Sequence, residues 1–216
     1  MMASKFKLSG LYVITDERLT PYEEGKIFDL VEKALKGGAR IVQLRDKSRK
    51  DKELIEIALQ LKKLCHKYEA LFIVNDRVSL AKEVEADGVH LGKDDEALEE
   101  ALKKLRGKII GVSCYGSLER AKWAESLGAS YVAFGSFFPS PTKPEAEVVP
   151  FEIISLAKKE LKIPICAIGG ITLERAEELI KKGADLIAVI SDIWLSENVE
   201  KRAKGYTEFF EKYGKL

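Results

Sequence analysis

Eight short apolar runs, rich in β-branched residues, recur along the chain with longer charged segments between them. The runs are Leu11–Asp16, Arg40–Arg45, Leu71–Asp76, Gly88–Gly92, Ile109–Cys114, Tyr131–Phe137, Pro164–Gly169 and Leu186–Ser191. Near-continuous apolar strands that alternate with amphipathic helices are typical of a parallel sheet whose faces are covered by helices. The alternation therefore predicts an α/β fold.

The segments between the runs have the spacing of amphipathic helices. In the second of them, apolar side chains follow the i, i+3, i+4, i+7 rule at Leu54, Ile57, Ala58, Leu61, Leu64 and Cys65. Four of the runs are introduced by a related tripeptide, namely Gly38-Ala39-Arg40, Ala86-Asp87-Gly88, Gly128-Ala129-Ser130 and Gly183-Ala184-Asp185. A glycine that ends a helix just before a buried strand explains this recurrence.

Eight β/α units in 216 residues match a closed (β/α)8 TIM barrel near the small end of its size range. We therefore expect a single TIM-barrel domain over residues 1–216, with Leu195–Tyr213 as a closing helix. The competing architecture is an open, doubly wound sheet, which normally has a glycine-rich turn after its first strand. Here that turn reads Asp16-Glu17-Arg18-Leu19-Thr20, which favours the barrel.

Charge and cysteine content narrow the class of protein. The 36 Lys and Arg residues nearly balance 35 Asp and Glu residues, which argues against nucleic-acid binding. The apolar runs are too short to span a membrane, and residues 1–10 lack the apolar core of a signal peptide. The widely separated Cys65, Cys114 and Cys166 predict neither a disulfide framework nor a zinc site, so we expect a cytoplasmic protein without a membrane partner.

The end of the second predicted strand carries a cluster of polar side chains. Because side chains alternate along a strand, Gln43, Arg45 and Lys47 share one face and Leu44 takes the other. Two cations and an amide on one face can bind a phosphate or pyrophosphate. The alternative is an exposed loop that happens to be charged, but the pattern begins inside the buried run.

Acidic residues follow the third and fourth predicted strands, at Asp76 and at Asp95. Mg²⁺ prefers one or two carboxylates together with substrate phosphate oxygens, so the two residues are candidate ligands. Helix capping is an equally good explanation, because each residue lies just before a predicted helix. His90 can belong either to the core or to the site, whereas His66 lies on a helix and is expected to be structural.

A second candidate anion site follows strands six to eight. The loop Phe138–Pro144 contains three prolines, two hydroxyl residues and Lys143, and suits a phosphate or a lid over one. Gly169-Gly170 and Ser191 end the last two strands, where barrels of this kind often bind phosphate on backbone amides. The two sites together predict two phosphorylated substrates, or one substrate with phosphates at both ends.

These motifs, taken in order, resemble those of thiamine-phosphate synthases. The matching segments are Gln-Leu-Arg-Asp-Lys at 43–47, Asn-Asp-Arg at 75–77, Gly-Val-His-Leu-Gly at 88–92 with Asp95, Gly-Val-Ser at 111–113, Pro-Ser-Pro-Thr-Lys at 139–143, Ile-Gly-Gly-Ile at 168–171 and Ile-Ser at 190–191. The resemblance implies a Mg²⁺-dependent transferase. It would join hydroxymethylpyrimidine pyrophosphate to a thiazole phosphate, forming thiamine phosphate and pyrophosphate, with CO2 where the thiazole is carboxylated.

The resemblance also implies roles for individual residues. It assigns the pyrimidine pyrophosphate to Gln43, Leu44, Arg45, Asp46, Lys47, Asn75, Ser113 and Lys143. It assigns the thiazole phosphate to Ser140, Pro141, Thr142, Lys143, Gly170, Ile190 and Ser191. Among these, Arg45, Lys47, Ser113 and Lys143 would act in catalysis, and Asp76 and Asp95 would bind Mg²⁺. Pyrophosphate can leave from an electron-rich aminopyrimidine methylene without a protein nucleophile, so positioning and charge suffice.

The chain departs from the family pattern at Lys93, Tyr115, Ser136 and Pro150, where glutamine, histidine, proline and glycine are frequent. Two other functions on the same kind of barrel remain open. One is a related thiazole tautomerase, an isomerase that uses a histidine at the position of Tyr115. The other is a barrel that binds thiamine-pathway ligands as a regulator without catalysis. The sequence leaves the oligomeric state open.

Overall fold

Eight parallel strands form a closed barrel in chain order in the computed structural model, which describes residues 7–93, 97–141 and 143–216. The strands are β1 (Gly10–Ile14), β2 (Ile41–Leu44), β3 (Leu71–Asn75), β4 (Gly88–Leu91), β5 (Ile109–Tyr115), β6 (Tyr131–Phe134), β7 (Ile165–Ala167) and β8 (Leu186–Val189). β1 pairs with both β2 and β8, which closes the ring. The predicted (β/α)8 TIM barrel is confirmed, and the open sheet is excluded.

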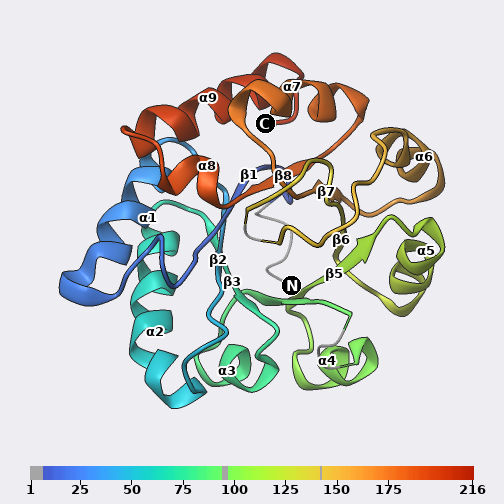
Figure 1. Cartoon of the computed structure of the whole chain (residues 1–216). Helices are drawn as coiled ribbons and strands as arrows, with labels where there is room; N and C mark the ends of the chain where they lie inside the picture. The colour runs from blue at the N-terminus through green and yellow to red at the C-terminus, as the bar shows by residue number, and fades with distance from the viewer. Residues whose placement is uncertain (1–6, 94–96, 142) are drawn as a thin grey trace.

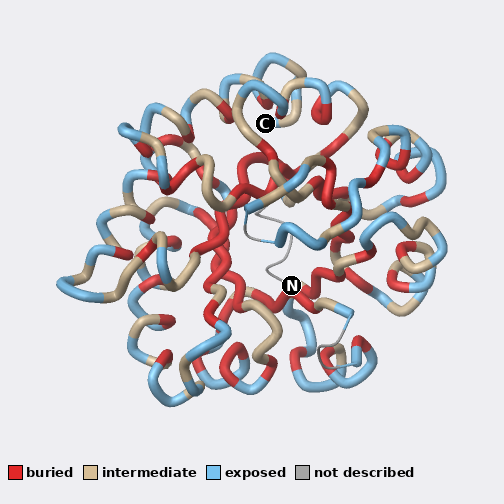
Figure 2. The backbone as a smooth tube through the Cα atoms, viewed as in Figure 1, coloured by how far each residue is buried: buried red, intermediate tan, exposed pale blue. Residues whose placement is uncertain are grey.

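Helices surround the barrel on its outside (Figure 1). They are α1 (Lys26–Lys36), preceded by the short helix η1 (Glu23–Gly25), α2 (Asp51–Lys67), α3 (Val78–Glu83), α4 (Leu98–Lys104), α5 (Leu118–Leu127), α6 (Glu152–Glu160), α7 (Leu173–Lys182), α8 (Ser191–Trp194) and α9 (Val199–Lys212). Figure 2 shows strands that are buried along most of their length and helices with exposed outer faces. Within the described ranges, no helix has both the length and the apolar character needed to cross a membrane.

The closing helix begins later than the sequence predicts. We expected one helix over Leu195–Tyr213, but α9 begins at Val199, and the side chain of Asn198 caps it by accepting from the N–H of Lys201. The preceding turn forms the separate helix α8. The Trp194 indole N–H donates to the carbonyl of Ile14 over 2.7 Å, so α8 is fixed to the end of β1 and cannot continue into α9 along the same axis.

Three of the four recurring tripeptides contain the predicted glycine turn. Gly38, Gly128 and Gly183 adopt positive φ angles of 102°, 106° and 120° between a helix and the following strand. This conformation costs glycine little because it has no Cβ. The fourth turn, before β4, has no glycine in this position. There Glu85, at φ 51°, adopts the left-handed conformation instead.

Two apolar cores follow from the alternation of side chains along the strands. The larger core lies between the barrel and the helices, and it includes Leu54, Ala58 and Leu61 of α2, as the helical spacing predicts. The smaller core fills the barrel and contains Tyr12 and Tyr131 among aliphatic side chains. The two tyrosine rings meet edge to face, with centroids 5.9 Å apart. The barrel is therefore packed at its centre.

A glycine makes room for one of these rings. Gly111 faces the barrel interior on β5, and a Cβ placed there would overlap the ring of Tyr131. Because cores are packed at crystal-like density, the ring has little space into which it can move. The large side chain at 131 therefore requires the absence of one at 111.

We predict that Gly111→Ala destabilises the protein by about 1–3 kcal/mol, the usual cost of overpacking a core. The matched control is Gly116→Ala, because a Cβ at Gly116 would meet Val149 at an ordinary 3.4 Å. Urea unfolding of both variants and the parent chain measures the difference. Equal midpoints for the two variants would contradict the packing argument.

Candidate active site

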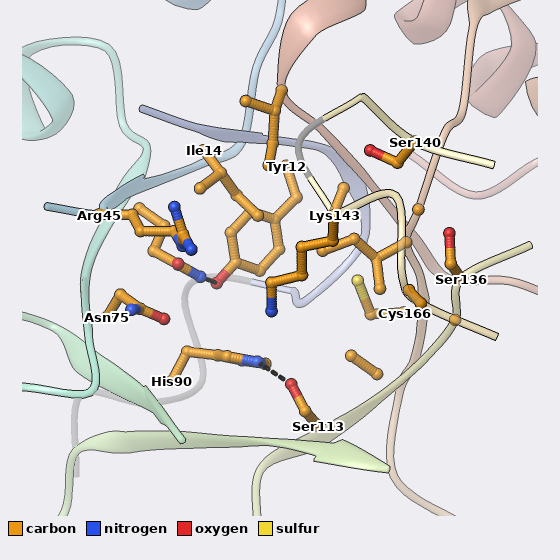
Figure 3. Close-up of a pocket in the computed structure, with 18 of the residues that line it drawn as sticks. Tyr12, Ile14, Arg45, Asn75, His90, Ser113, Ser136, Ser140, Lys143 and Cys166 are labelled. Carbon is orange, nitrogen blue, oxygen red and sulfur yellow. Dashed lines mark hydrogen bonds between the residues drawn. The ribbon is translucent and has the colours of Figure 1, made fainter. Parts of the chain in front are cut away.

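A pocket opens at the carboxyl ends of the strands, lined by residues from strand ends and from the loop between β6 and α6 (Figure 3). Its lower wall continues the inward-facing positions of the strands, so that Tyr12 and Ile14 of β1 are followed around the ring by Gln43, Asn75 and His90. The inward face of the barrel is therefore polar at the ends of β2–β5, where Gln43, Asn75, His90 and Ser113 line the pocket, and apolar on the β1, β6, β7 and β8 side.

Positive charge gathers at the mouth of this pocket. Arg45 and Lys143 line it from opposite sides, and Figure 3 shows the Lys143 side chain extending across the opening. Lys47 lies at the rim, where its ammonium group forms an ion pair with Asp76 of the neighbouring strand end. Three cations on two loops, the one after β2 and the one after β6, produce a site that attracts phosphate groups.

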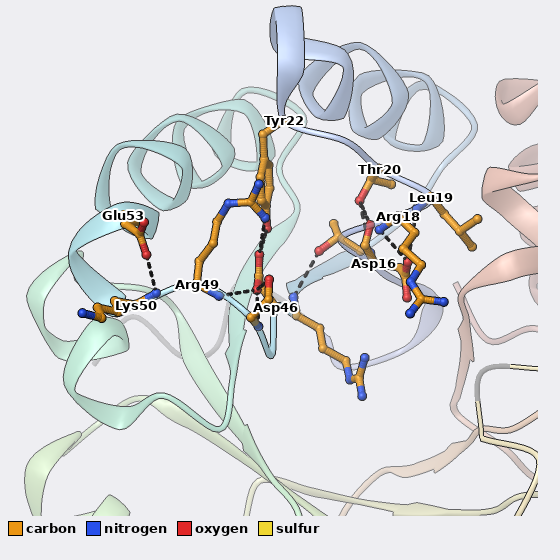
Figure 4. A network of polar contacts seen from close by, with 12 residues as sticks. Asp16, Arg18, Leu19, Thr20, Tyr22, Asp46, Arg49, Lys50 and Glu53 are labelled. Carbon is orange, nitrogen blue, oxygen red and sulfur yellow. Dashed lines mark hydrogen bonds and ion pairs between the residues drawn. The ribbon is translucent and has the colours of Figure 1, made fainter.

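The loop after β2 is held in place by Asp46, whose carboxylate lies beside Tyr22 and Arg49 (Figure 4) and does not line the pocket. It accepts from the backbone N–H groups of Ser48 and Arg49 at 2.7 and 2.9 Å, and from the Tyr22 hydroxyl at 2.7 Å. Burial by itself raises the pKa of Asp46, but these hydrogen bonds outweigh it and lower the pKa below its usual range. Asp46 therefore remains ionised and fixes the loop that carries Lys47.

Neighbouring groups complete the support of this loop. The N–H of Arg45 donates over 3.1 Å to the hydroxyl of Thr15, the residue that follows β1. The Arg77 guanidinium donates to the carbonyl of Asp46 over 2.7 Å and to the carboxylate of Asp51 over 2.6 Å. The backbone around Arg45 is thus bonded on both sides before any ligand arrives, which reduces the entropy lost when a ligand is bound.

The second predicted anion region is built from two loops in close contact. Gly169 and Gly170 follow β7 with φ angles of 104° and 65°. A Cβ on Gly169 would overlap Ser136, and one on Gly170 would overlap the backbone of Phe138 and Pro139. Only glycine permits both the left-handed turn and this approach, which brings the loop after β6 over the barrel mouth.

Pro141 and Ser191 face a shallower groove beside the pocket, together with Arg45, Glu17 and Arg18. Arg45 lines both spaces, so the groove and the pocket lie next to each other on either side of this residue. The turn after β1 that forms the far side of the groove is ordered by Asp16, whose carboxylate accepts from the N–H of Arg18 over 2.8 Å. The two predicted anion regions therefore adjoin each other.

His90 lies at the base of the pocket with both ring nitrogens hydrogen-bonded. Nδ1 is 2.8 Å from the Tyr131 hydroxyl, and Nε2 is 2.7 Å from the Ser113 hydroxyl. Burial, followed by the positive charges of Lys143 and Lys47, lowers the pKa of His90 to about 4. The sequence left open whether His90 belongs to the core or to the site, and both are true: His90 is buried and hydrogen-bonded, and it also lines the pocket.

Comparison with known proteins agrees with this geometry. A family model described as thiamine monophosphate synthase matches residues 11–193. A thiamine-phosphate synthase from Nitrosococcus oceani is 44% identical over 207 residues, covering 95% of this chain and 94% of its own length. One from Wolinella succinogenes is 46% identical, with 92% of each chain covered. The chain belongs to the thiamine-phosphate synthase family. Enzymes of this family are transferases that release pyrophosphate.

A solved structure is similar over the whole barrel. The thiamine phosphate pyrophosphorylase from Pyrococcus furiosus superposes with a TM-score of 0.87 at 41% identity, covering 95% of this chain and 97% of that one. The similarity therefore includes the strand ends and the loops that surround the mouth.

Most residues assigned through the synthase resemblance meet at the mouth. Those lining the pocket are Gln43, Arg45, Asn75, Ser113, Ser140, Lys143 and Ile190. Lys47 and Asp76 are at the rim, Pro141 and Ser191 are in the groove, and Gly170 shapes the turn between the loops. Leu44 faces away from the pocket into the outer core, as strand alternation requires, and Asp46 is engaged within its own loop. Thr142 and Asp95 are outside the described residues.

The four departures from the synthase pattern are accommodated locally. Two of them contact each other, because the backbone N–H of Lys93 donates to the Tyr115 hydroxyl over 3.0 Å. Ser136 donates from its hydroxyl to the carbonyl of Phe138 over 2.6 Å. Pro150 lies two residues before α6, and its carbonyl accepts from the N–H of Ile153. Each departing residue thus makes a contact of its own within the loops of the mouth.

Three residues of the site were not predicted from the sequence: Tyr12 and Ser136 line the pocket, and Tyr131 is a partner of His90. A usable signal existed for the tyrosines. Each lies at an inward-facing position of a strand whose other inward residues are apolar or small, and each carries a hydroxyl that must find a partner when buried. Ser136 had no such signal, because its place depends on the approach of Gly169.

The low pKa of His90 predicts a pH dependence of stability. The unfolded chain binds a proton at His90 near pH 6.5, whereas the folded chain does so only near pH 4. Between these values the unfolded state holds more protons, so stability decreases as the pH is lowered. We expect a loss on the order of 3 kcal/mol from this residue over that window, since each pKa unit corresponds to about 1.4 kcal/mol.

Urea unfolding from pH 7 to pH 4 measures this loss, with His90→Gln compared with the parent chain. His66→Gln is the control, because His66 lies on the exposed side of α2 beside Asp87. The variant at position 90 should lose much of the decline, and the variant at position 66 should keep it. Identical pH profiles for the parent chain and His90→Gln would contradict the assigned pKa shift.

Proposed function

We propose that this chain catalyses the formation of thiamine phosphate from hydroxymethylpyrimidine pyrophosphate and a thiazole phosphate, with release of pyrophosphate. The observation that carries the proposal is the ring of cations at Arg45, Lys47 and Lys143 around a pocket with a neutral, hydrogen-bonding base. The charged rim is complementary to a pyrophosphate group. The neutral hydrogen-bonding side chains at the bottom of the pocket are complementary to an aminopyrimidine ring. The three free, buried cysteines are consistent with a reducing cytoplasm.

The two adjoining spaces suit two phosphorylated substrates. The pocket side offers Arg45, Asn75 and Ser113 to the pyrophosphate of the pyrimidine. The groove side offers Ser191 and the loop before Lys143 to the phosphate of the thiazole. Because Arg45 borders both spaces, the two substrates would lie next to each other, and this proximity lowers the entropic part of the barrier.

The rim suits a Mg²⁺ ion that is bound by one or two carboxylates and completed by phosphate oxygens of the substrate. Asp76 supplies one carboxylate there, and the Asn75 amide donates to it over 3.3 Å. No cluster of three or more acidic, histidine or cysteine ligands occurs among the described residues, so a site made wholly of protein ligands is not formed by them. A carboxylate plus substrate phosphate oxygens is sufficient for Mg²⁺. Asp76, joined by Asp95, would hold the ion, which would neutralise charge on the departing pyrophosphate.

The chain's own residues would act mainly through charge and position. As the bond between the pyrimidine methylene and pyrophosphate breaks, negative charge increases on the bridging oxygen. Arg45, Lys47 and Lys143 are already held near that place, so they stabilise the charge without reorganisation. The aminopyrimidine ring stabilises the positive methylene carbon, and the thiazole nitrogen then attacks it. This sequence of steps requires no protein nucleophile and no general base.

A tautomerase would require a base at the mouth, and the side chains present do not favour one. Tyr115 stands where a histidine serves the related isomerase, and a phenol ordinarily ionises near pH 10. His90 has both ring nitrogens engaged and a lowered pKa of about 4. The same two side chains are compatible with a synthase, which transfers no proton to a side chain in its central step.

The direct test uses the purified protein with both substrates, with and without Mg²⁺, and follows pyrophosphate and thiamine phosphate together. We expect equal amounts of both products, and only when Mg²⁺ and both substrates are present. A parallel sample with the carboxylated thiazole reports whether that form is accepted. Aromatisation of the exocyclic thiazole tautomer without pyrophosphate release would identify an isomerase, and binding without turnover would identify a regulator.

Arg45→Ala should lower kcat/KM by roughly 100-fold or more, the scale of removing one preorganised charged donor. Arg106→Ala is the matched control, since Arg106 is exposed between α4 and β5, at the opposite end of the barrel. Steady-state kinetics with both substrates measures the effect. A decrease of less than about threefold for Arg45→Ala would remove this residue from the reaction.

A further inference from the structure

Five side chains form a continuous hydrogen-bonded chain across the base of the pocket. Gln43 Nε2 donates to the Tyr12 hydroxyl over 2.7 Å, and the Tyr12 and Tyr131 hydroxyls are 2.7 Å apart. The Tyr131 hydroxyl is 2.8 Å from His90 Nδ1, and His90 Nε2 is 2.7 Å from the Ser113 hydroxyl. The chain thus joins β2, β1, β6, β4 and β5, and its last member lines the pocket.

The first bond sets the direction of all the others. An amide nitrogen can only donate, so the Tyr12 oxygen accepts from Gln43 and its own O–H is directed to Tyr131. The Tyr131 O–H then donates to His90 Nδ1. A neutral imidazole that accepts at Nδ1 carries its proton on Nε2. The opposite direction would leave the Tyr12 proton without an acceptor among the contacts of the described residues.

We propose that Tyr12 and Tyr131 hold His90 in the Nε2–H tautomer, so that the Ser113 hydroxyl accepts from His90 and directs its own proton to an anionic oxygen in the pocket. Tyr131 and His90 are positioning residues, and Ser113 is the group that touches the ligand. The inference rests on the proposed function only in naming that ligand as the pyrophosphate group. The tautomer itself is a property of the free protein.

The surroundings of these five hydrogen-bonded side chains support this arrangement. The rings of His90 and Tyr131 stack with centroids 5.6 Å apart, which limits rotation of the imidazole. Burial raises the pKa of both Tyr12 and Tyr131 well above the ordinary value, so both keep their protons. The positive charges of Lys143 and Lys47 oppose protonation of the imidazole, which would give the ring a positive charge of its own. A neutral histidine with one fixed proton is the state compatible with all three conditions.

The tautomer can be read directly by ¹⁵N NMR of the free protein near neutral pH. The chain contains only two histidines, and a His66→Gln variant assigns the signals of His90. We expect Nε2 to carry the proton and Nδ1 to resonate as an unprotonated nitrogen. A proton on Nδ1 would mean that the Gln43 amide is reversed and that the five side chains donate in the opposite direction, which overturns the proposal.

The consequence for Ser113 is tested by binding of inorganic pyrophosphate in the presence of Mg²⁺. Ser113→Ala should weaken binding by roughly 10-fold, the effect of losing a donor to a charged group. Tyr131→Phe should weaken it by roughly threefold or more, because His90 is no longer held in one tautomer. In the double variant, the affinity should equal that of Ser113→Ala alone within about twofold, because both changes act through one hydroxyl.

Tyr206→Phe is the matched control. Tyr206 is equally buried, and its hydroxyl bonds to Asp192 outside the barrel. It should lower stability without changing the His90 signals or the affinity for pyrophosphate. Additive losses in the double variant, or an equal loss in Tyr206→Phe, would overturn the role of Tyr131. If the synthase assay fails while the expected tautomer and pyrophosphate affinities are found, the proposed function is wrong and the inference stands.

Discussion

The hydrogen bond between the hydroxyls of Tyr12 and Tyr131 divides the barrel into two parts. Below it the interior is filled by aliphatic side chains, and above it polar side chains of β2–β5 line one side of the pocket. Both hydroxyls are buried, and a buried hydroxyl without a partner costs about 1–3 kcal/mol. Each tyrosine therefore satisfies the other and also connects to the next polar side chain. The base of the pocket depends on this one contact, and Gly111 provides the space in which it forms.

The rim of the pocket is stabilised in a different way from its base. Its cations lie on loops, and loops are ordinarily the least ordered parts of a barrel. Here the loop after β2 is bonded through Asp46 and Arg77, and the loop after β6 packs against Gly169 and Gly170. The carboxylate of Asp46 does not contact the pocket. Its contribution is to keep the segment around Arg45 in one conformation, which is the condition for electrostatic preorganisation.

A rim of charge over a neutral base suits a reaction that proceeds by departure of an anion. The barrel places groups from all eight strands around one opening, so charges far apart in the sequence can act on one leaving group. A reaction of this kind needs no nucleophile, and the charged side chains that line the pocket, Arg45 and Lys143, are cations. The low pKa of His90 fits the same scheme, since a neutral imidazole can transmit a hydrogen-bond direction without adding charge to the base of the pocket.

Local pattern was sufficient for the architecture and for the cationic strand end. The eight apolar runs fixed the number of strands, because a parallel strand buried on both faces must be apolar throughout, and alternation alone placed Gln43 and Arg45 inward and Leu44 outward. The glycine turns at Gly38, Gly128 and Gly183 were predictable for the same local reason. Helix boundaries were less predictable, because the start of α9 depends on the long-range hydrogen bond between Trp194 and Ile14.

Only the tertiary structure decided which inward residues meet. Tyr12 and Tyr131 are 119 positions apart, and no periodicity within either strand shows that their hydroxyls face each other. The same holds for His90, whose two partners come from neighbouring and distant strands. Strand alternation is a property of the local backbone, and it therefore determines which side chains enter the barrel. The closure of the ring is a long-range property, and it alone determines which of them touch.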